Sequence, residues 1–264
     1  MERRDFIKQS AIASSIAFSP NLLFSMSNIE DEIPLIDYHV HLNRNLSIED
    51  AVANFQSKKM KFGIAEHPGR HTNIVDDNTL QSYIQNIHSY KALAGLQPIT
   101  PGWDGVFSPE AISKLDYVIM DALEIPDGKG NVERIWQQRF ILYNKSTFMD
   151  RYTDYYIDVL ENGKANILAN PTLLPISLAP EYYKLWTENR MDKIIQCAVK
   201  NNVALEINSV YQYPKTPFIK MAKEAGAKFA FGSNGHAIPE LKNYDYCLEM
   251  IKECNLTKDD ILSI

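Results

Sequence analysis

Three observations in the sequence predict an α/β fold, a (β/α)7 barrel in one large domain. Seven short apolar segments, rich in β-branched and aromatic residues, follow one another along the 264 residues. Segments of helical periodicity separate them, so we expect the strands to run parallel and to close into a barrel. Histidines and other polar residues gather where the strands end, which is where such barrels carry their active sites.

The N-terminal segment, residues 1–27, stands apart from this alternation. It contains the run RRDFIK at residues 3–8 and then a mildly apolar stretch that is too short and too polar to span a bilayer. This pattern resembles a twin-arginine export signal, and a basic amphipathic helix is the alternative. We expect a signal peptide cleaved near Ser25 to Asn28, and a barrel domain over residues 28–264. The mature protein is then exported to the periplasm or beyond the cytoplasm, with no transmembrane segment.

Each strand of the barrel is predicted from a short apolar run bounded by turn residues. Each run ends on polar residues, which a barrel of parallel strands brings together at one rim. The predicted strands are 34–42 (PLIDYHVHL), 61–67 (KFGIAEH), 91–99 (KALAGLQPI), 115–123 (LDYVIMDAL), 165–171 (ANILANP), 203–209 (VALEINS) and 228–234 (KFAFGSN).

Helix starts support the same alternation. Ser47 is a favourable N-cap before SIEDAVANFQ, Asp76 or Asp77 precedes NTLQSYIQNI, and Pro217 fits the first turn of TPFIKMAKEA. One polar stretch, residues 124–145, interrupts the pattern after the fourth strand, and we expect it to form a loop or lid over one barrel end.

Composition excludes some classes of partner. The net charge of −6 offers no attraction to a phosphate backbone, so nucleic acid is not an expected partner and a small molecule is. Of the three cysteines, Cys247 and Cys254 lie about 10 Å apart on a predicted helix and cannot form a disulfide.

Four of the six histidines fall at the predicted rim. His39 and His41 alternate on one strand, so both imidazoles point to the same side and can bind one cation. His67 ends the neighbouring strand and His236 follows the last strand, which lies beside the first in a closed barrel. The alternative is a set of buried, hydrogen-bonded histidines, but three adjacent strand ends favour a metal site.

With these histidines and the strand-end motifs around them, the chain resembles the PHP (polymerase and histidinol phosphatase) family. DYHVH, GIAEHP, GLQP, LDYVIMDA, ILANPT, ALEINS and FGSNGHA follow that family's pattern in order over nearly all of residues 34–237. The resemblance implies a distorted, TIM-like barrel that cleaves phosphoesters with up to three divalent ions. It also implies that His39 and His41 bind one metal, whereas His67 and His236 belong to another site.

The chain departs from that family at four positions. Gln97 stands in place of a bridging glutamate, Leu123 and Asn170 in place of histidines, and Asn234 in place of an aspartate. Neutral amide oxygens are poor ligands for zinc, manganese or iron. We therefore expect at most one tightly bound divalent ion (Zn, Mn or Fe) per chain, held by the surviving histidines.

Carboxylates and loop residues complete the predicted site. Glu66 and Glu206 are candidate general bases, although each could instead orient a metal-binding histidine. Arg70 could bind a phosphate or carboxylate of the substrate, with a solvated loop arginine as the alternative. The residues expected to line the substrate pocket are Gln97, Trp103, Glu124, Asn170, Asn208, Asn234 and His71.

Three functions are compatible with these residues. The first is a metal-dependent hydrolase of the PHP phosphoesterase type with a reduced metal site. The second is a PHP-like barrel without catalytic activity that binds a small polar or carbohydrate ligand. The third, which LIDYHVHL alone would allow, is an amidohydrolase-like metal hydrolase, and the absence of further histidine and aspartate ligands at later strand ends argues against it.

Overall fold

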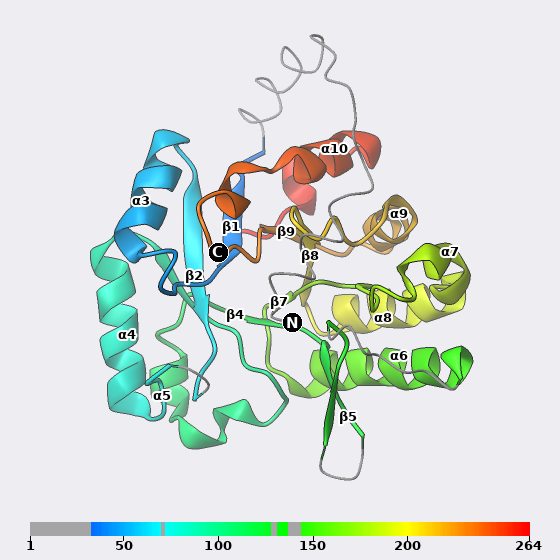
Figure 1. The fold of residues 1–264 in the computed structure, drawn as a ribbon, viewed down its shortest axis with the longest axis horizontal. Coiled ribbons are helices and arrows are strands. Elements are labelled where there is room, and N and C mark those ends of the chain that lie inside the picture. Colours follow the sequence, from blue (N-terminus) through cyan, green and yellow to red (C-terminus); the bar gives the residue numbers. More distant parts are fainter. Residues whose placement is uncertain (1–32, 70–71, 128–130, 137–143) are drawn as a thin grey trace.

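The chain folds as a closed barrel of seven parallel strands with helices around it (Figure 1). The computed structural model describes residues 33–69, 72–127, 131–136 and 144–264. The strand order is β1-β2-β3-β4-β7-β8-β9, and every predicted strand is present, so the predicted fold class is confirmed. The strands are β1 Ile36–Val40, β2 Lys61–Glu66, β3 Leu93–Leu96, β4 Tyr117–Met120, β7 Ile167–Leu168, β8 Ala204–Asn208 and β9 Phe229–Gly232.

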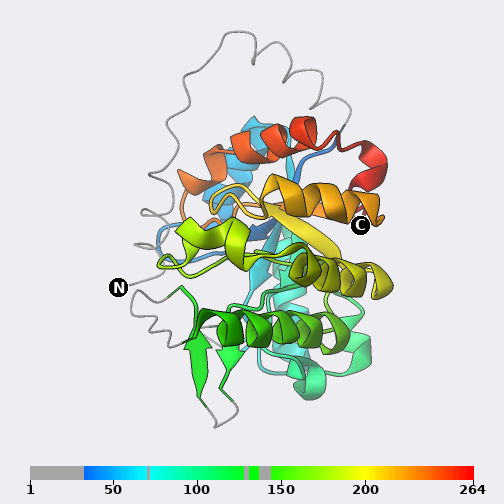
Figure 2. The ribbon, with the colours of Figure 1, turned by 90° about the vertical axis from the view of Figure 1, so that its right-hand side faces the viewer.

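Helices pack on the outer face of the barrel, and Figure 2 shows α6, α8, α9 and α10 stacked along one side. The predicted helix starts are confirmed: Ser47 and Asp76 cap α3 and α4, and Pro217 lies in the first turn of α9. The helices are α3 Ile48–Ser57, α4 Asp77–Ser89, α5 Pro109–Ile112, α6 Lys145–Asn162, α7 Tyr182–Leu185, α8 Glu188–Lys200, α9 Thr216–Glu224 and α10 Asp245–Glu253, with short 3-10 helices at Trp103–Val106, Ala179–Glu181, Glu240–Lys242 and Lys258–Asp260.

Side chains fill the barrel interior near the amino ends of the strands. The Tyr117 hydroxyl donates a hydrogen bond across the interior to the Tyr38 carbonyl at 2.7 Å, and the two rings meet edge to face. A Cβ atom at Gly95 would lie 2.3 Å from the Tyr117 ring, so only glycine leaves room for it. This end of the barrel is therefore a packed core and not a pore.

Polar residues occupy the interior at the opposite end, where the strands finish. Alternate residues of a strand share a face, and Ala65 on β2 and Ile119 on β4 belong to the inner apolar cluster. Two residues further along the chain stand His67 and Asp121. The change from apolar to polar along each strand thus places the chemistry at the carboxyl-terminal mouth of the barrel.

The described part of the stretch after β4 contains two strands where a loop or lid was predicted. Within it, β5 (Glu124–Pro126) and β6 (Val132–Arg134) form an antiparallel hairpin, in which Glu124 pairs directly with Arg134. Figure 1 shows this hairpin projecting from the body of the barrel. The sequence prediction missed it because each strand has only three residues and Pro126 lies in one of them.

The described residues bear on the cysteines and on membrane spans, but not on the predicted signal peptide. The proposed signal, residues 1–27, and its cleavage position lie outside them. All three cysteines are free and buried, in agreement with the expectation that Cys247 and Cys254 do not pair. In the part of the chain that the structure describes, no helix combines the length and apolar character that crossing a membrane requires.

Candidate active site at the barrel mouth

His39 lies at the centre of a buried chain of polar contacts. Its Nδ1 atom lies 2.6 Å from Glu206 Oε1 on β8, and its Nε2 atom lies 3.2 Å from Gln97 Oε1 after β3. The Gln97 side-chain amide in turn donates to Asp121 Oδ2 at 3.0 Å. Glu206 is fully buried and also accepts the backbone N–H of Asn170 at 2.6 Å. This geometry favours the orienting role for Glu206 over the role of general base.

A glycine on the last strand makes room for this pair. A Cβ atom at Gly232 would lie 2.0 Å from Glu206 Oε1 and 2.8 Å from His39 Cβ. Gly232 pairs with Asn208 in the β8–β9 register, and the preceding Phe231 pairs with Asp37 of β1. Packing therefore requires glycine at position 232.

The rings of His39, His67 and His236 all lie around the ring of His41. The His41 ring stacks on the rings of His236 and His67, with centroids 4.7 and 5.0 Å apart and interplanar angles of 9° and 18°. His39 meets His41 edge to face at 5.1 Å. His67 Nδ1 lies 2.7 Å from the Gln97 carbonyl oxygen, which holds its ring in place. The structure thus brings together all four histidines that the sequence predicted.

Glu66 is the carboxylate at the β2 end of this cluster. Its Oε1 atom accepts the backbone N–H of Leu42, immediately after His41, at 2.8 Å. Burial raises the pKa of Glu66 to about 7, against the smaller opposite effect of the hydrogen bond from Leu42. A carboxyl group with such a pKa exchanges protons near neutrality, which is what a general acid or base must do.

The four imidazoles have the right chemistry for zinc or iron, but their arrangement is not that of a loaded site. Rings that bind one ion each contain it in their plane, and two stacked rings cannot both do so. Among the described residues, no group of three or more His, Cys, Asp or Glu side chains is placed to hold an ion. Gln97, Asn170 and Asn234 add only neutral amides, which are poor ligands for these metals.

Asparagines form the rest of the mouth. Asn170 and Asn234 are fully buried and adopt left-handed backbone conformations, with φ of 49° and 51°. Asn208 ends β8 on the same face as Glu206, and its Oδ1 atom accepts the backbone N–H groups of Val210 and Tyr211. These three predicted pocket residues therefore lie at the ends of β7, β8 and β9, next to one another in the barrel.

Other predicted site residues lie elsewhere. The indole of Trp103 is buried in the core and donates to the Gly163 carbonyl at 2.8 Å, before β7 begins. The prediction that it lines the pocket is wrong, because this contact holds it against the outer helices. Glu124 is buried on the hairpin and paired with Arg134. Arg70 and His71 lie outside the described residues.

Two residues that contact predicted residues, Tyr244 and Arg134, were not identified from the sequence. The Tyr244 hydroxyl donates to Asp37 Oδ2 at 2.6 Å, and Asp37 Oδ1 accepts the backbone N–H groups of His39 and Ser233. Burial raises the pKa of Asp37. Asp37 thus ties the two chain segments that carry His39 and Asn234, and no local pattern links Tyr244 to it. Arg134 was missed because its partner Glu124 is identified only by the hairpin register.

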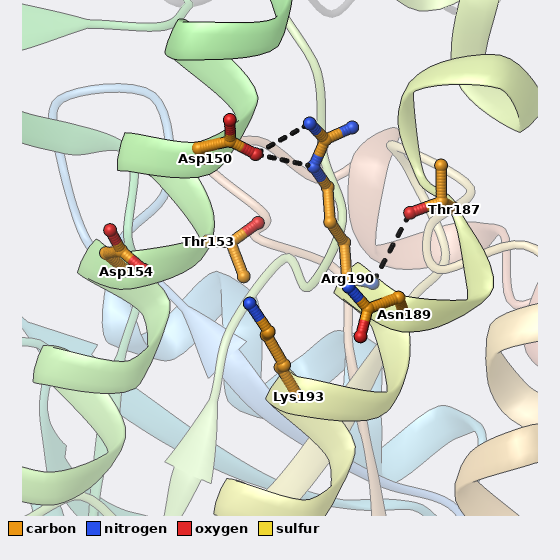
Figure 3. Close-up of a pocket in the computed structure, with 7 residues that line it drawn as sticks. All are labelled: Asp150, Thr153, Asp154, Thr187, Asn189, Arg190 and Lys193. Atoms are coloured by element: carbon orange, nitrogen blue, oxygen red, sulfur yellow. Dashed lines mark hydrogen bonds and ion pairs between the residues drawn. The ribbon is translucent and has the colours of Figure 1, made fainter.

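A pocket of about 350 Å³ lies outside the barrel, between α6 and α8 (Figure 3). Two of its charged residues form an ion pair, since Arg190 contacts Asp150 at 2.7 Å. Tyr152 and Tyr156 of α6 donate to the carbonyls of Leu173 and Asn170, so these rings stand between the helix and the barrel mouth. This pocket is therefore separate from the histidine cluster.

Sequence comparisons point to phosphatases at low identity. The chain is similar to a probable phosphatase of Vibrio parahaemolyticus, with 25% identity over 121 residues that cover 42% of this chain and 44% of the relative. Probable phosphatases of Aliivibrio fischeri and Aeromonas salmonicida are 22% identical over the same shares of both chains. The aligned part thus spans less than half of each relative, and no family model matches the chain.

Among solved structures, a chain of an archaeal ribonuclease P aligns with a TM-score of 0.43 at 12% identity, over 83% of this chain and 90% of that one. The catalytic domain of a mannanase from Streptomyces sp. SirexAA-E aligns with a TM-score of 0.39 at 11% identity, over 93% and 82%. From its own strand order and the sequence comparisons, the chain is a seven-stranded α/β barrel with distant sequence similarity to curated probable phosphatases.

Proposed function

We propose that this protein is a hydrolase of phosphoesters of the PHP type, acting at the histidine cluster with at most one tightly bound divalent ion. The observation that carries the proposal is the convergence of four imidazoles at the barrel mouth, one of them oriented by the buried carboxylate of Glu206. The similarity to curated probable phosphatases supports the same class of reaction.

The chain's own residues suit such a reaction. In hydrolysis a water oxygen attacks phosphorus, the ester P–O bond breaks, and the departing oxygen takes up a proton. Glu66, which precedes His67 and accepts the backbone N–H of the residue after His41, is the candidate to accept the proton of the water, and a protonated imidazole of the cluster can supply the proton to the leaving oxygen. Glu206 keeps the His39 ring fixed throughout. A divalent ion would be held by imidazoles of the cluster only after the stacked rings of His41, His67 and His236 have turned apart, and it would then polarise a phosphoryl oxygen.

The test compares two histidine variants with a matched control. His67→Ala and His236→Ala each remove an imidazole from the cluster, and we expect each to lower the rate of phosphomonoester hydrolysis by about 100-fold or more. His88→Ala is the control, because His88 lies on α4 and pairs with Asp116 away from the mouth. Circular dichroism checks that each variant is folded, and elemental analysis of protein purified without chelators should find no more than one divalent ion per chain.

A second candidate is a barrel that binds a ligand without converting it. The contact of Gln97 with His39 favours it, since an amide oxygen occupies the position at Nε2 of the imidazole that a metal ion would need. The same assay separates the two functions. Absence of turnover with phosphomonoesters, phosphodiesters and simple esters, with and without added zinc, manganese or iron, would leave only the binding function.

A further inference from the structure

Polar side-chain atoms at the ends of β7, β8 and β9 are buried without a hydrogen-bond partner. Both amide atoms of Asn170, both of Asn234 and the Nδ2 atom of Asn208 have none among the described residues. The three side chains are fully buried. Buried polar atoms in native proteins are paired in more than about 90% of cases, and each unpaired one costs about 1–3 kcal/mol. So many unpaired amide atoms on adjacent strands indicate that something else binds there.

A positive φ explains why asparagine occurs at these positions, but not why its side-chain amide has no hydrogen-bond partner. Asparagine is favoured where φ is positive, as at Asn170 and Asn234. In turns, however, an asparagine side chain normally bonds to nearby backbone, as Asn208 does through its Oδ1 atom. Asn170 and Asn234 make no such bond among the described residues. Their amides are held in place with their hydrogen-bonding capacity unused.

All three asparagines lie close to Glu206. The Asn170 backbone N–H donates to Glu206 Oε2 at 2.6 Å, and Asn208 follows Glu206 by two residues on the same strand face. Asn234 follows Gly232, where a Cβ atom would lie 2.0 Å from Glu206 Oε1. Since Glu206 also contacts His39, these three residues lie on strand ends next to the histidine cluster. The mouth thus has an imidazole part and a neutral amide part.

We infer that the amide part binds hydroxyl groups of the alcohol portion of the substrate, and that the substrate is a phosphate ester of a sugar or another polyol. Each amide both donates and accepts, which matches a hydroxyl group. A phosphate group would instead be bound by cationic side chains, and none of the three asparagines provides one. The inference rests on the proposed hydrolase, in which the imidazole part acts on the phosphoryl group.

The test uses glycine variants, because glycine keeps a left-handed backbone while removing the amide. For Asn170→Gly and Asn234→Gly we expect the ratio of kcat/KM for glucose 6-phosphate or glycerol 1-phosphate to kcat/KM for phenyl phosphate to fall about tenfold, as the loss of one or two hydrogen bonds predicts. Asn202→Gly is the matched control, since Asn202 also has a positive φ, of 55°, but is exposed after α8.

Direct binding separates this inference from the proposed function. Binding of glucose, glycerol and myo-inositol to the unmodified protein is measured by ligand-observed NMR, which needs no turnover. Weakened polyol binding in both asparagine variants, with the control unaffected, would support the amide part even if no phosphoester is hydrolysed, and the hydrolase proposal alone would then fail. An unchanged specificity ratio, or no polyol binding by the parent protein, would overturn the inference.

Discussion

At Gly232 a single hydrogen atom in place of a methyl group lets Glu206 reach His39. Gly232→Ala should therefore displace the carboxylate or the ring. We expect a loss of about 1–3 kcal/mol in the free energy of unfolding, the range for overpacked cores, together with at least a tenfold loss of hydrolysis. Urea titration and the phosphomonoester assay measure the two effects.

Gly105→Ala is the matched control for that substitution. A Cβ atom at Gly105 meets nothing within 4 Å, so this variant should unfold and react like the parent protein. If both alanine variants behaved alike, the close approach at Gly232 would have no role in holding His39.

Individual site residues could be predicted only where the chemistry is local. The four histidines were identified because each lies at or just after the end of a predicted strand, and a barrel brings strand ends together. The contact of Gln97 with His39 could not be predicted, because it depends on side-chain reach across the interior. Trp103 was misplaced for a related reason: its loop begins at the mouth, but the indole bonds to Gly163 among the outer elements.

Among the elements, the β5–β6 hairpin offers a clear test of an ion pair. Glu124 is nearly buried and its Oε2 atom lies 3.3 Å from Arg134 Nε. Arg134→Met would leave this carboxylate without its guanidinium, and we expect the free energy of unfolding to fall by about 1–3 kcal/mol. That is less than for a fully buried pair, since the arginine side chain is 36% exposed.

Lys114→Met provides the comparison for the hairpin. Lys114 pairs with Glu110 within one helical turn, and the two side chains are 45% and 84% exposed. Such surface pairs contribute about 0–1 kcal/mol, so this variant should differ little from the parent in urea titration. Equal losses for both variants would mean that the hairpin pair is no stronger than a surface contact.

All seven barrel strands could be predicted from composition, but their ends could not. β7 has only two residues, Ile167 and Leu168, where the apolar run suggested residues 165–171. The positive φ of Asn170 ends the extended conformation there, and asparagine signals this only weakly. β1 likewise stops at Val40, so His41 belongs to the loop after the strand.

At the scale of the whole molecule, we expect Asp37 to stabilise the closure of the barrel between β1 and β9. It accepts hydrogen bonds from the backbone of His39 and Ser233 and from the Tyr244 hydroxyl. Asp37→Ala would leave three buried donors without this acceptor, and we expect a loss of at least about 3 kcal/mol in the free energy of unfolding. Tyr244→Phe removes a single donor and should cost about 1 kcal/mol.

Urea titration of these two variants gives the comparison. A larger effect for Asp37→Ala than for Tyr244→Phe is the expected order, because only the aspartate also binds the two backbone segments. The reverse order would show that closure depends on the packing of Tyr244 rather than on the carboxylate.

The seam between β1 and β9 also bears on how the protein is made. Asp37 pairs with Phe231, and the His41 backbone N–H donates to the Gly235 carbonyl at 2.9 Å, so one of the two neighbours of the first strand is the last strand. A ribosome releases His39 and His41 long before His236, and pairing across so long a stretch of chain is slow to form. A nascent chain that has reached β8 therefore has an open edge and an unfinished mouth. We expect hydrolytic activity to arise only once β9 has been synthesised, so that nascent chains that lack β9 are inactive.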